Sequence, residues 1–292
     1  MKLRPNDENI TLKRHFYLRF VYWKMNKLMK VPFADCEHIA CNDLPLPEGN
    51  KDVDIITIAF NNTHVLRHQI ELVKKNIEDA KINYIVADNS TLEYKSQEIK
   101  ALCAEHGLGY IRLPKNQWLD KRSGSYSHGA AMNWLYYNYV NKRKPYIFGF
   151  LDHDIYPLTK LSLADKTGEQ GFYGYRRMKK EIAYWYLWPG MAFFKYDRLK
   201  NVNVNFAPCM VDKLYLDTGG SLFPVFYRKF DPAKLNFASF KRFPLSDIGY
   251  DNSSEVEFID EKVWFHSANA SYWREVNRYE DIIDDIIQKT KS

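Results

Sequence analysis

Four short apolar runs alternate with segments of helical periodicity between residues 52 and 152, and this order restricts the fold more than any other feature. The first run, residues 55–60, is rich in β-branched residues, as in a strand buried on both faces. The next apolar residues are spaced by four, three and four positions, as on one helical face. They are Leu66, Ile70, Val73 and Ile77. Further strands are expected at 83–87, 110–113 and 146–151, with helices between them. Strands joined in this way form a mostly parallel α/β sheet with helices on both faces.

The length and composition fit a folded protein with a large core. The chain has 292 residues, of which 46% are hydrophobic and 27% charged, enough for one large domain or two closely packed halves. We expect an N-terminal extension over residues 1–50, an α/β half over 51–158, a smaller mixed region over 159–274 and a C-terminal helix over 275–292. Later strands are expected at 171–175, 191–196, 222–227 and 262–265.

The fourth expected strand ends abruptly in two carboxylates, Asp152 and Asp154. Residues i and i+2 of an extended segment point the same way, so both carboxylates can face one partner. Burying two negative charges is unfavourable unless something compensates them. α/β sheets bind ligands at the carboxyl ends of their strands. There, a divalent cation that carries a phosphorylated ligand can balance the charge of the two aspartates. The pattern therefore predicts Mn²⁺ or Mg²⁺ at this pair, and the alternative is two aspartates that cap a helix or turn.

A second Asp-x-Asp sequence shows how little the motif says alone. Asp52 and Asp54 precede the first strand, which places them at the opposite edge of a parallel sheet, away from ligands. We expect them to be solvated residues at the strand entry. We therefore choose Asp152 and Asp154 as the candidate metal ligands because they lie at the end of a strand, and not because of the motif alone.

Polar residues also follow the other strands at the ligand edge. Asp88 follows the second strand, where it can accept a hydrogen bond from a base or ribose, or else cap the next helix. His128 lies where small residues open a helix, so that the helix N-terminus can face a phosphate; tight packing on the sheet is the alternative. We expect a site for a nucleotide-activated ligand lined by Phe60, Asn61, Asp88, His128 and Asp152.

Four stretches together resemble the nucleotide-binding half of GT-A fold glycosyltransferases, particularly family 2. They are residues 55–62, 87–90, 129–133 and 148–154. The resemblance covers residues 52–158 well and the remainder loosely. It implies a Rossmann-like GT-A fold, a nucleotide-sugar donor, a base or ribose contact at Asp88 and a divalent metal at Asp152 and Asp154.

The resemblance also implies roles for residues of the second half. His266 directly follows an apolar strand, where such enzymes often have a histidine that completes the metal or diphosphate site; a structural histidine is the alternative. Asp217, beside two glycines, is the expected base for the acceptor hydroxyl, with Asp212 as the less distinctive alternative. The acidic pair usual in family 2 is missing here. Trp188, in the aromatic cluster at 184–191, is expected to contact the sugar.

These features predict a metal-dependent, hexosyltransferase-like enzyme. It would move a sugar, with inversion, from a nucleoside diphosphate sugar to a carbohydrate or lipid-linked acceptor, in polysaccharide or glycolipid synthesis. One alternative is a sugar-1-phosphate nucleotidyltransferase, which needs a Gly-rich basic loop after the first strand, where this chain has Phe-Asn-Asn-Thr at 60–63. The other is a non-catalytic carbohydrate-binding protein, which has no need for Asp152 and Asp154.

Charge and hydropathy bear on partners and location. The net charge is +6 and the basic residues are dispersed, apart from residues 13–30. This charge is a weak argument for nucleic acid and a better one for phosphate-bearing ligands or an anionic membrane surface, so we expect no nucleic-acid partner. Residues 12–29 combine aromatic side chains with five Lys or Arg, as in a helix on an anionic membrane or one packed on the protein body. No run of about 18 apolar residues and no leader pattern is visible. We expect a cytoplasmic protein, at the inner face of the membrane if residues 12–30 reach it.

Overall fold

The computed structural model describes residues 12–28, 30, 45–116, 124–179, 183–212, 214–244, 246, 255–267 and 279–291. Most of the expected extension over residues 1–50 therefore lies outside the described part. What is described contains a six-stranded sheet, a four-stranded sheet and a two-stranded hairpin.

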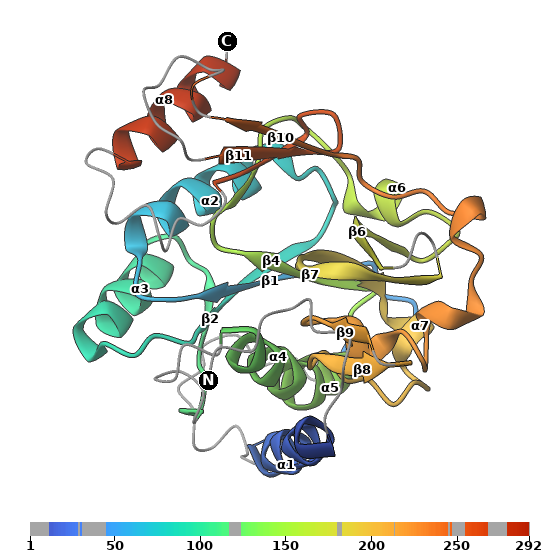
Figure 1. The fold of residues 1–292 in the computed structure, drawn as a ribbon. Helices are drawn as coiled ribbons and strands as arrows, with labels where there is room; N and C mark the ends of the chain where they lie inside the picture. Colours follow the sequence, from blue (N-terminus) through green and yellow to red (C-terminus); the bar gives the residue numbers. More distant parts are fainter. Residues whose placement is uncertain are drawn as a thin grey trace.

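The central sheet has the strand order β3-β2-β1-β4-β7-β6 (Figure 1). Its strands are β1 (Val53–Ala59), β2 (Ile82–Asp88), β3 (Gly109–Arg112), β4 (Ile147–Asp152), β6 (Phe172–Lys179) and β7 (Tyr184–Lys195). The first four are parallel neighbours, whereas β7 runs antiparallel to both β4 and β6. The expected mostly parallel α/β sheet is confirmed. Strands β6 and β7 come from the second half of the chain, so both halves contribute to one sheet.

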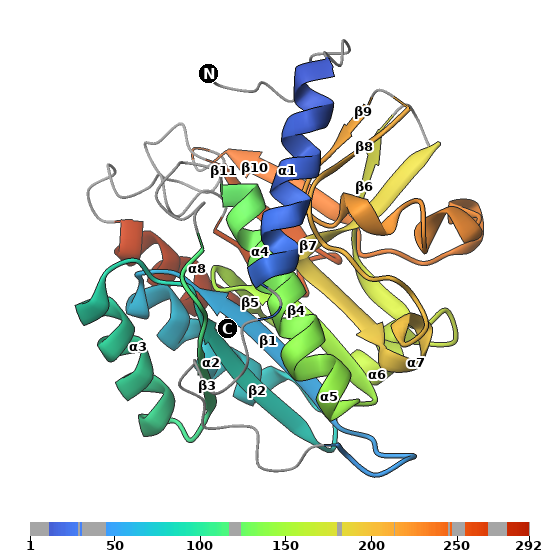
Figure 2. The ribbon, with the colours of Figure 1, turned by 90° about the horizontal axis from the view of Figure 1, so that it is seen from below.

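Helices cover both faces of this sheet (Figures 1 and 2). On one side lie α2 (Thr63–Asn76) and α3 (Glu93–Glu105), and on the other α4 (Gly124–Leu135), a π-helical turn (Tyr136–Val140) and α5 (Asn141–Arg143). Alternate residues of β1 serve the two layers: Ile55 packs in the α2–α3 layer and Ile56 in the α4 layer. Asn62 caps α2, because its side-chain oxygen accepts from the backbone N–H groups of His64 and Val65.

The second sheet joins two segments that are far apart in sequence. It is antiparallel, in the order β10 (Phe240–Pro244), β11 (Glu255–Ile259), β12 (Trp264–His266) and β5 (Ile155–Pro157). Strand β5 begins directly after Asp154, and its Ile155 is paired with His266 of β12. The sheet therefore brings the predicted late histidine to the acidic end of β4.

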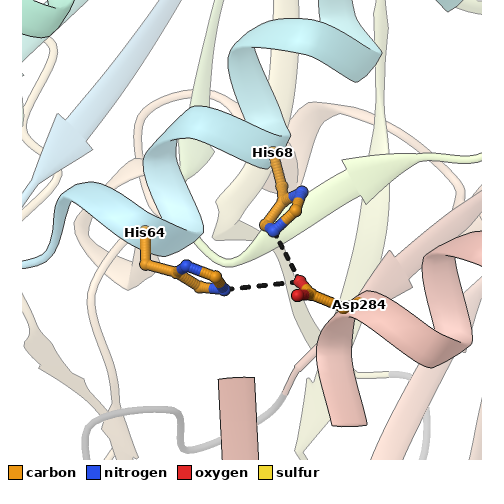
Figure 3. Close-up of side chains that lie close together, drawn as sticks. All are labelled: His64, His68 and Asp284. Atoms are coloured by element: carbon orange, nitrogen blue, oxygen red, sulfur yellow. Dashed lines mark ion pairs between the residues drawn. The ribbon is translucent and has the colours of Figure 1, made fainter. Parts of the chain in front are cut away.

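The C-terminal helix α8 (Tyr279–Lys291) confirms the helix expected at the end of the chain. It packs against α2 and the second sheet through an apolar cluster that includes Val65, Val256, Phe265 and Ile283. Beside this cluster, Asp284 of α8 faces two histidines of α2 (Figure 3).

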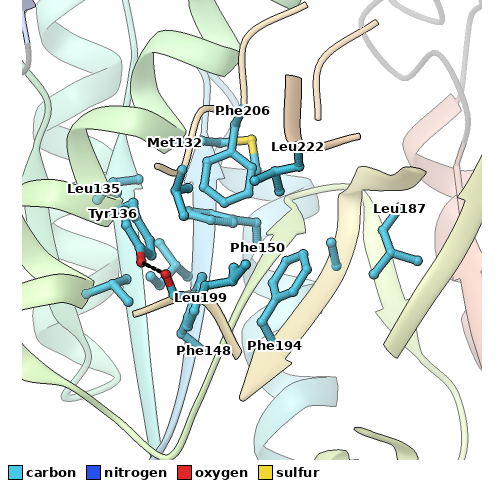
Figure 4. Packing of buried hydrophobic residues seen from close by; sticks show 14 of the residues in the cluster. Met132, Leu135, Tyr136, Phe148, Phe150, Leu187, Phe194, Leu199, Phe206 and Leu222 are labelled. Carbon is cyan, nitrogen blue, oxygen red and sulfur yellow. Dashed lines mark hydrogen bonds between the residues drawn. The ribbon is translucent and has the colours of Figure 1, made fainter. Parts of the chain in front are cut away.

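The core between the central sheet and α4 is unusually aromatic (Figure 4). Phe148 and Phe150 of β4 pack with Phe194 of β7 and with Phe206. Many of the aromatic residues noted in the sequence thus fill the interior. The strand expected at 222–227 is wrong: this segment lies in 3₁₀ turns, Gly220–Leu222 and Tyr227–Lys229, that push apolar side chains into the same core. A short apolar run alone does not separate a strand from such a core segment.

The remaining elements are short. They are α6 (Leu163–Thr167), α7 (Tyr196–Leu199), the 3₁₀ turn Pro232–Lys234 and the hairpin of β8 (Cys209–Val211) and β9 (Leu214–Leu216). Of the helices that the structure describes, none is long and apolar enough to cross a bilayer.

Helix α1 (Leu12–Leu28) packs on α4 and still leaves aromatic side chains outside. Leu18, Val21 and Met25 are buried against Tyr126, Ala130 and Ala207. On the solvent side Phe16, Phe20 and Trp23 are about half exposed, at 59%, 50% and 51%. The helix is therefore anchored to the body and exposes a second apolar strip.

Candidate active site

The loops after β1, β2 and β4 are tied to one another at the carboxyl edge of the sheet. Asn61 has a positive φ of 52°, and its backbone N–H donates to Ser90 Oγ at 2.9 Å. Its side-chain oxygen accepts from the N–H groups of Thr91 and Leu92, both at 3.2 Å. The backbone N–H of Phe60 donates to His153 Nδ1 at 3.2 Å. His153 is the middle residue of the Asp-His-Asp sequence, so its ring joins the first strand's loop to the acidic loop.

Asp88 lies at the predicted edge, but its carboxylate is turned into the protein. It is fully buried and accepts from Ser90 N–H at 2.9 Å, Ser96 Oγ at 2.5 Å and Tyr110 OH at 2.9 Å. Arg112 Nη1 lies 3.1 Å from the same carboxylate. In this structure Asp88 therefore shapes the loop after β2, instead of presenting its oxygens to a base or ribose as expected. It does not cap α3 either, since the N-cap position is Leu92.

Asp154, His266, Glu257 and Arg242 form a row in which acidic and basic side chains alternate. His266 Nε2 lies 3.5 Å from Asp154 Oδ1, and His266 Nδ1 lies 2.6 Å from Glu257 Oε2. Glu257 in turn accepts from Arg242, with Nη2 at 2.6 Å. Burial alone would lower the pKa of His266, but Asp154 and Glu257 raise it to about 10. Burial alone would raise the pKa of Asp154, and the facing imidazole outweighs it and lowers that pKa.

Asp152 faces a different histidine. His128 Nε2, from α4, lies 3.4 Å from Asp152 Oδ1, and both side chains are about one quarter exposed. Gln69 of α2 donates to the backbone carbonyls of Asp152 and Ile155, both at 2.7 Å, which fixes the turn between β4 and β5. A Cβ at Gly190 would lie only 2.6 Å from Asp152 Oδ2. Glycine at that position therefore leaves room for the carboxylate.

Trp188 forms a wall beside this group. Its ring centroid lies 4.9 Å from that of His266, and the guanidinium carbon of Arg177 lies 5.6 Å from the Trp188 ring. The neighbouring Trp185 and Tyr186 are buried in the core instead. Trp188 thus contacts the group around His266, whereas Trp185 packs in the core and the buried Tyr186 accepts from the backbone N–H of Asp217 through its hydroxyl.

The ligand atoms of this site suit a cation whose coordination shell is completed by a bound ligand. Within the described ranges, neither Asp152 nor Asp154 forms an ion pair with Lys or Arg. Among the described residues, Asp152, Asp154 and His266 do not bring three ligand atoms within 4.8 Å of one another, whereas His64, His68 and Asp284 do. Mg²⁺ and similar ions are typically held by one or two carboxylates, with phosphates and water as the other ligands. The residues present fit that mode.

A cavity of about 310 Å³ is lined by Asp217 and by two residues that contact Trp188, Tyr175 and Arg177. Asp217 Oδ1 accepts from the N–H of Thr218 at 2.8 Å, and its own N–H donates to Tyr186 OH at 3.2 Å. The lining also holds Arg177 and Arg242. Asp212 does not line this cavity and accepts from Tyr184 OH at 2.6 Å. Of the two candidate bases, Asp217 is the one that lines this cavity.

A larger cavity, of about 570 Å³, lies at the opposite edge and includes residues 45–50 and 144–146. It adjoins the amino-terminal ends of β1 and β4, and α/β sheets bind ligands at the other end. Size is therefore a poorer guide to the site here than position.

Asp52 and Asp54 lie at this far edge, as expected, but they are not solvated. Asp54 is fully buried, with Arg143 Nε at 2.9 Å and Tyr139 OH at 3.0 Å. Asp52 lies 3.2 Å from Arg143 Nη2. The expectation of a solvated pair is wrong because α5 places an arginine across both carboxylates.

Sequence reasoning missed Glu257, Arg242 and Gln69. Glu257 had a detectable signal, since it lies between Val256 and Phe258 in a strand and is only 6% exposed. A carboxylate that is buried among the apolar residues of a strand needs a hydrogen-bonding or positively charged partner. The identity of that partner depends on β-sheet pairing, which the sequence does not show.

No family profile matches the chain, and no curated protein matches it. Solved structures match part of it. They include S. aureus TarS (16% identity, TM-score 0.37, covering 53% of this chain and 30% of TarS). Another is mannosyltransferase PcManGT from Pyrobaculum calidifontis in complex with GDP-Man and Mn²⁺ (14%, 0.35, covering 64% and 55%). A third is the galactosyltransferase LgtC in complex with donor and acceptor sugar analogs (16%, 0.34, covering 50% and 59%). The chain spans less than two thirds of each of these proteins. At these identities and TM-scores, any activity must be argued from the site itself.

Proposed function

We propose that the protein is a metal-dependent glycosyltransferase that moves a sugar from a nucleoside diphosphate sugar to an acceptor hydroxyl. One observation carries the proposal: Asp152 and Asp154 lie at the carboxyl end of β4, and each faces a histidine, which can release its proton to a metal ion, instead of a described Lys or Arg. Two adjacent carboxylates at a ligand edge are then available to a divalent ion.

The proposed metal ligands are Asp154, His266 and Asp152. When bound, Mn²⁺ or Mg²⁺ supplies Lewis-acid stabilisation of the departing diphosphate. Glu257 holds His266 at Nδ1, so that Nε2 stays directed at Asp154, as an outer carboxylate orients many ligating histidines. His128 faces Asp152 from α4, where it can contact a phosphate oxygen of the donor. Phe60 and Asn61 form the neighbouring loop, which we assign to the nucleoside, with Asp88 holding its far side in shape.

The cavity at Asp217 is the proposed acceptor site. Asp217 takes the proton of the acceptor hydroxyl as that oxygen attacks the anomeric carbon, and this single displacement inverts the anomeric centre. Trp188 contacts both His266 and Arg177 of the cavity lining, and its ring can stack on a sugar. Arg177, Lys179 and Arg242 also line the cavity, which favours an acceptor that carries an anionic group.

The direct test is turnover of sugar nucleotides. UDP-, GDP- and dTDP-hexoses and a CMP-sugar are incubated with the protein and Mn²⁺, and release of the nucleotide is followed with and without EDTA. We expect slow, EDTA-sensitive hydrolysis of one donor class, and transfer once an acceptor is added. Metal-independent binding of free sugar without any hydrolysis would instead indicate a carbohydrate-binding protein. The anomeric configuration of the product, read by NMR, tests inversion.

We also propose that α1 contacts an anionic membrane surface, which would bring a lipid-linked acceptor to the site. The exposed strip of Phe16, Phe20 and Trp23 supports this, with Lys24 and Lys27 lying 4.4 Å and 3.9 Å from the rings of Phe20 and Trp23. Co-sedimentation with vesicles that contain phosphatidylserine tests it. Trp23→Ala should weaken binding, whereas Tyr94→Ala, which removes a ring 60% exposed on α3, should not.

A further inference from the structure

Three side chains outside the proposed active site converge between α2 and α8 (Figure 3). His68 Nε2 lies 2.7 Å from Asp284 Oδ1, and His64 Nε2 lies 3.4 Å from the same oxygen. All three ligand atoms lie within 4.8 Å of one another. The two imidazole rings stand nearly perpendicular, with their centroids 4.8 Å apart.

The sequence and the packing both direct these groups inward. His64 and His68 are spaced i, i+4, which places them one above the other on one helical face. Apolar contacts of Val65 and Leu72 with Ile283 and Ile286 hold α8 against that face. The side chains are partly exposed, yet His64 Nε2 and Asp284 Oδ1 are themselves shielded from solvent. Their donor atoms thus point at a common centre and not at bulk water.

The spacing is compatible with a transition metal as well as with the ion pairs that the structure shows. Tetrahedral zinc with ligands at about 2.0–2.1 Å separates its ligand atoms by roughly 3.3 Å. The separation between His64 and Asp284 already has this value, and the one between His68 and Asp284 needs to open by roughly 0.6 Å, a small side-chain adjustment.

We propose that His64, His68 and Asp284 form a Zn²⁺ site that fastens the C-terminal helix to α2. Two imidazoles and one carboxylate suit Zn²⁺, with water as the fourth ligand. The site is distinct from the one at Asp154, whose partner His266 belongs to β12. The Zn²⁺ site would affect the proposed active site through the packing of α8. Helix α8 packs on Val256 and Phe265, the immediate neighbours of Glu257 and His266, so fastening the helix supports the strands that hold the proposed metal ligand.

The test uses the full-length chain with both Asp152 and Asp154 changed to Asn, so that the other proposed metal site is disabled. Co²⁺ is titrated as a spectroscopic substitute for Zn²⁺, and competition with Zn²⁺ gives the affinity. We expect one equivalent of Co²⁺, a visible d–d absorption band, loss of the band on adding Zn²⁺, and a higher Tm with Zn²⁺ than with EDTA.

The matched pair of variants is Asp284→Asn and Asp285→Asn. Asp285 is the neighbouring carboxylate, which pairs with Lys289 at 2.7 Å on the outer side of α8. Asp284→Asn and His68→Gln should each weaken Zn²⁺ binding by more than the roughly 10–100-fold that loss of an outer-shell partner causes. Asp285→Asn should bind like its parent. Absence of the band, or an equal band in the Asp284→Asn variant, would overturn the proposed site.

Discussion

The chain contains the same Asp-x-Asp pattern at both edges of one sheet, and the two copies have opposite surroundings. Asp52 directly precedes β1 and Asp54 is its second residue, and Arg143 lies 3.2 Å and 2.9 Å from the two carboxylates. Asp152 is the last residue of β4 and Asp154 lies two residues further on, and they face His128 and His266, at 3.4 Å and 3.5 Å. Strands β1 and β4 are parallel neighbours, so the two pairs lie at opposite edges of the sheet.

The two pairs have the same carboxylates but different neighbouring groups. The group that balances their negative charge therefore distinguishes a structural pair from a candidate site. A guanidinium is a permanent cation, and its bidentate geometry occupies both acids. An imidazole can instead act as a metal ligand beside the carboxylates. The following predictions use this contrast, from the largest expected effect to the smallest.

Asp154→Asn should have the largest effect, because it removes a proposed metal ligand. Several kilocalories per mole of leaving-group stabilisation correspond to a fall in kcat/KM of at least about 10³-fold. Asp52→Asn, in the other pair, should leave kcat/KM within a small factor of the wild-type value. Steady-state turnover of the donor identified above measures both. Equal losses in the two variants would remove the distinction between the pairs.

Asp217→Asn should lower kcat by about 10²–10⁴-fold, the usual contribution of a general base. Donor affinity should stay unchanged, since Asp217 lines the proposed acceptor cavity and is not among the proposed metal ligands. Titration of the donor with Mn²⁺ present separates the two effects. Asp212→Asn is the control. If Asp217→Asn turned over at the wild-type rate, the assignment of the base would be wrong.

Arg143→Met should reduce stability instead of activity. It leaves Asp54 buried without its cation, and breaking a buried pair in this way typically costs about 3–5 kcal/mol. Urea unfolding measures the loss, and donor affinity of the folded fraction should match the wild type. A stable variant that no longer bound donor would show that the far edge takes part in the reaction.

The pH dependence of stability sharpens the same contrast by a smaller amount. Burial raises the pKa of Asp54 from 3.8 to about 6, although Arg143 and Tyr139 oppose it. Between these pH values the folded state holds a proton that the unfolded state has lost, so stability falls as pH rises. The difference in unfolding free energy between wild type and Asp54→Asn should therefore fall from pH 4 to 6, by at most about 1.4 kcal/mol per unit. A flat or rising difference would contradict the shift.

The fold was largely predictable because its signals are local. The β-branched runs, the helical spacing that begins at Leu66 and the cap at Asn62 each depend on a few adjacent residues. Residues 222–227 were misread because a core-filling 3₁₀ segment has the same apolar content as a strand.

The sequence predicted those site residues whose position follows from the end of a strand. Asp152, Asp154 and His266 follow strands, and sheet pairing brought them together. The saturation of Asp88 by Tyr110 and Arg112 was not visible, nor was the burial of Asp54 by Arg143, 89 residues away. Such pairs depend on tertiary contacts that leave no mark in local sequence.

The most direct test of the central claim is a thermal-shift measurement with UDP, GDP, dTDP and CMP, each with and without Mn²⁺. A cation that links the acidic end of β4 to phosphates requires that one nucleotide raise Tm only when Mn²⁺ is present. That rise should vanish in Asp154→Asn and persist in Asp52→Asn. Stabilisation that is independent of Mn²⁺, or that survives in Asp154→Asn, would contradict the account.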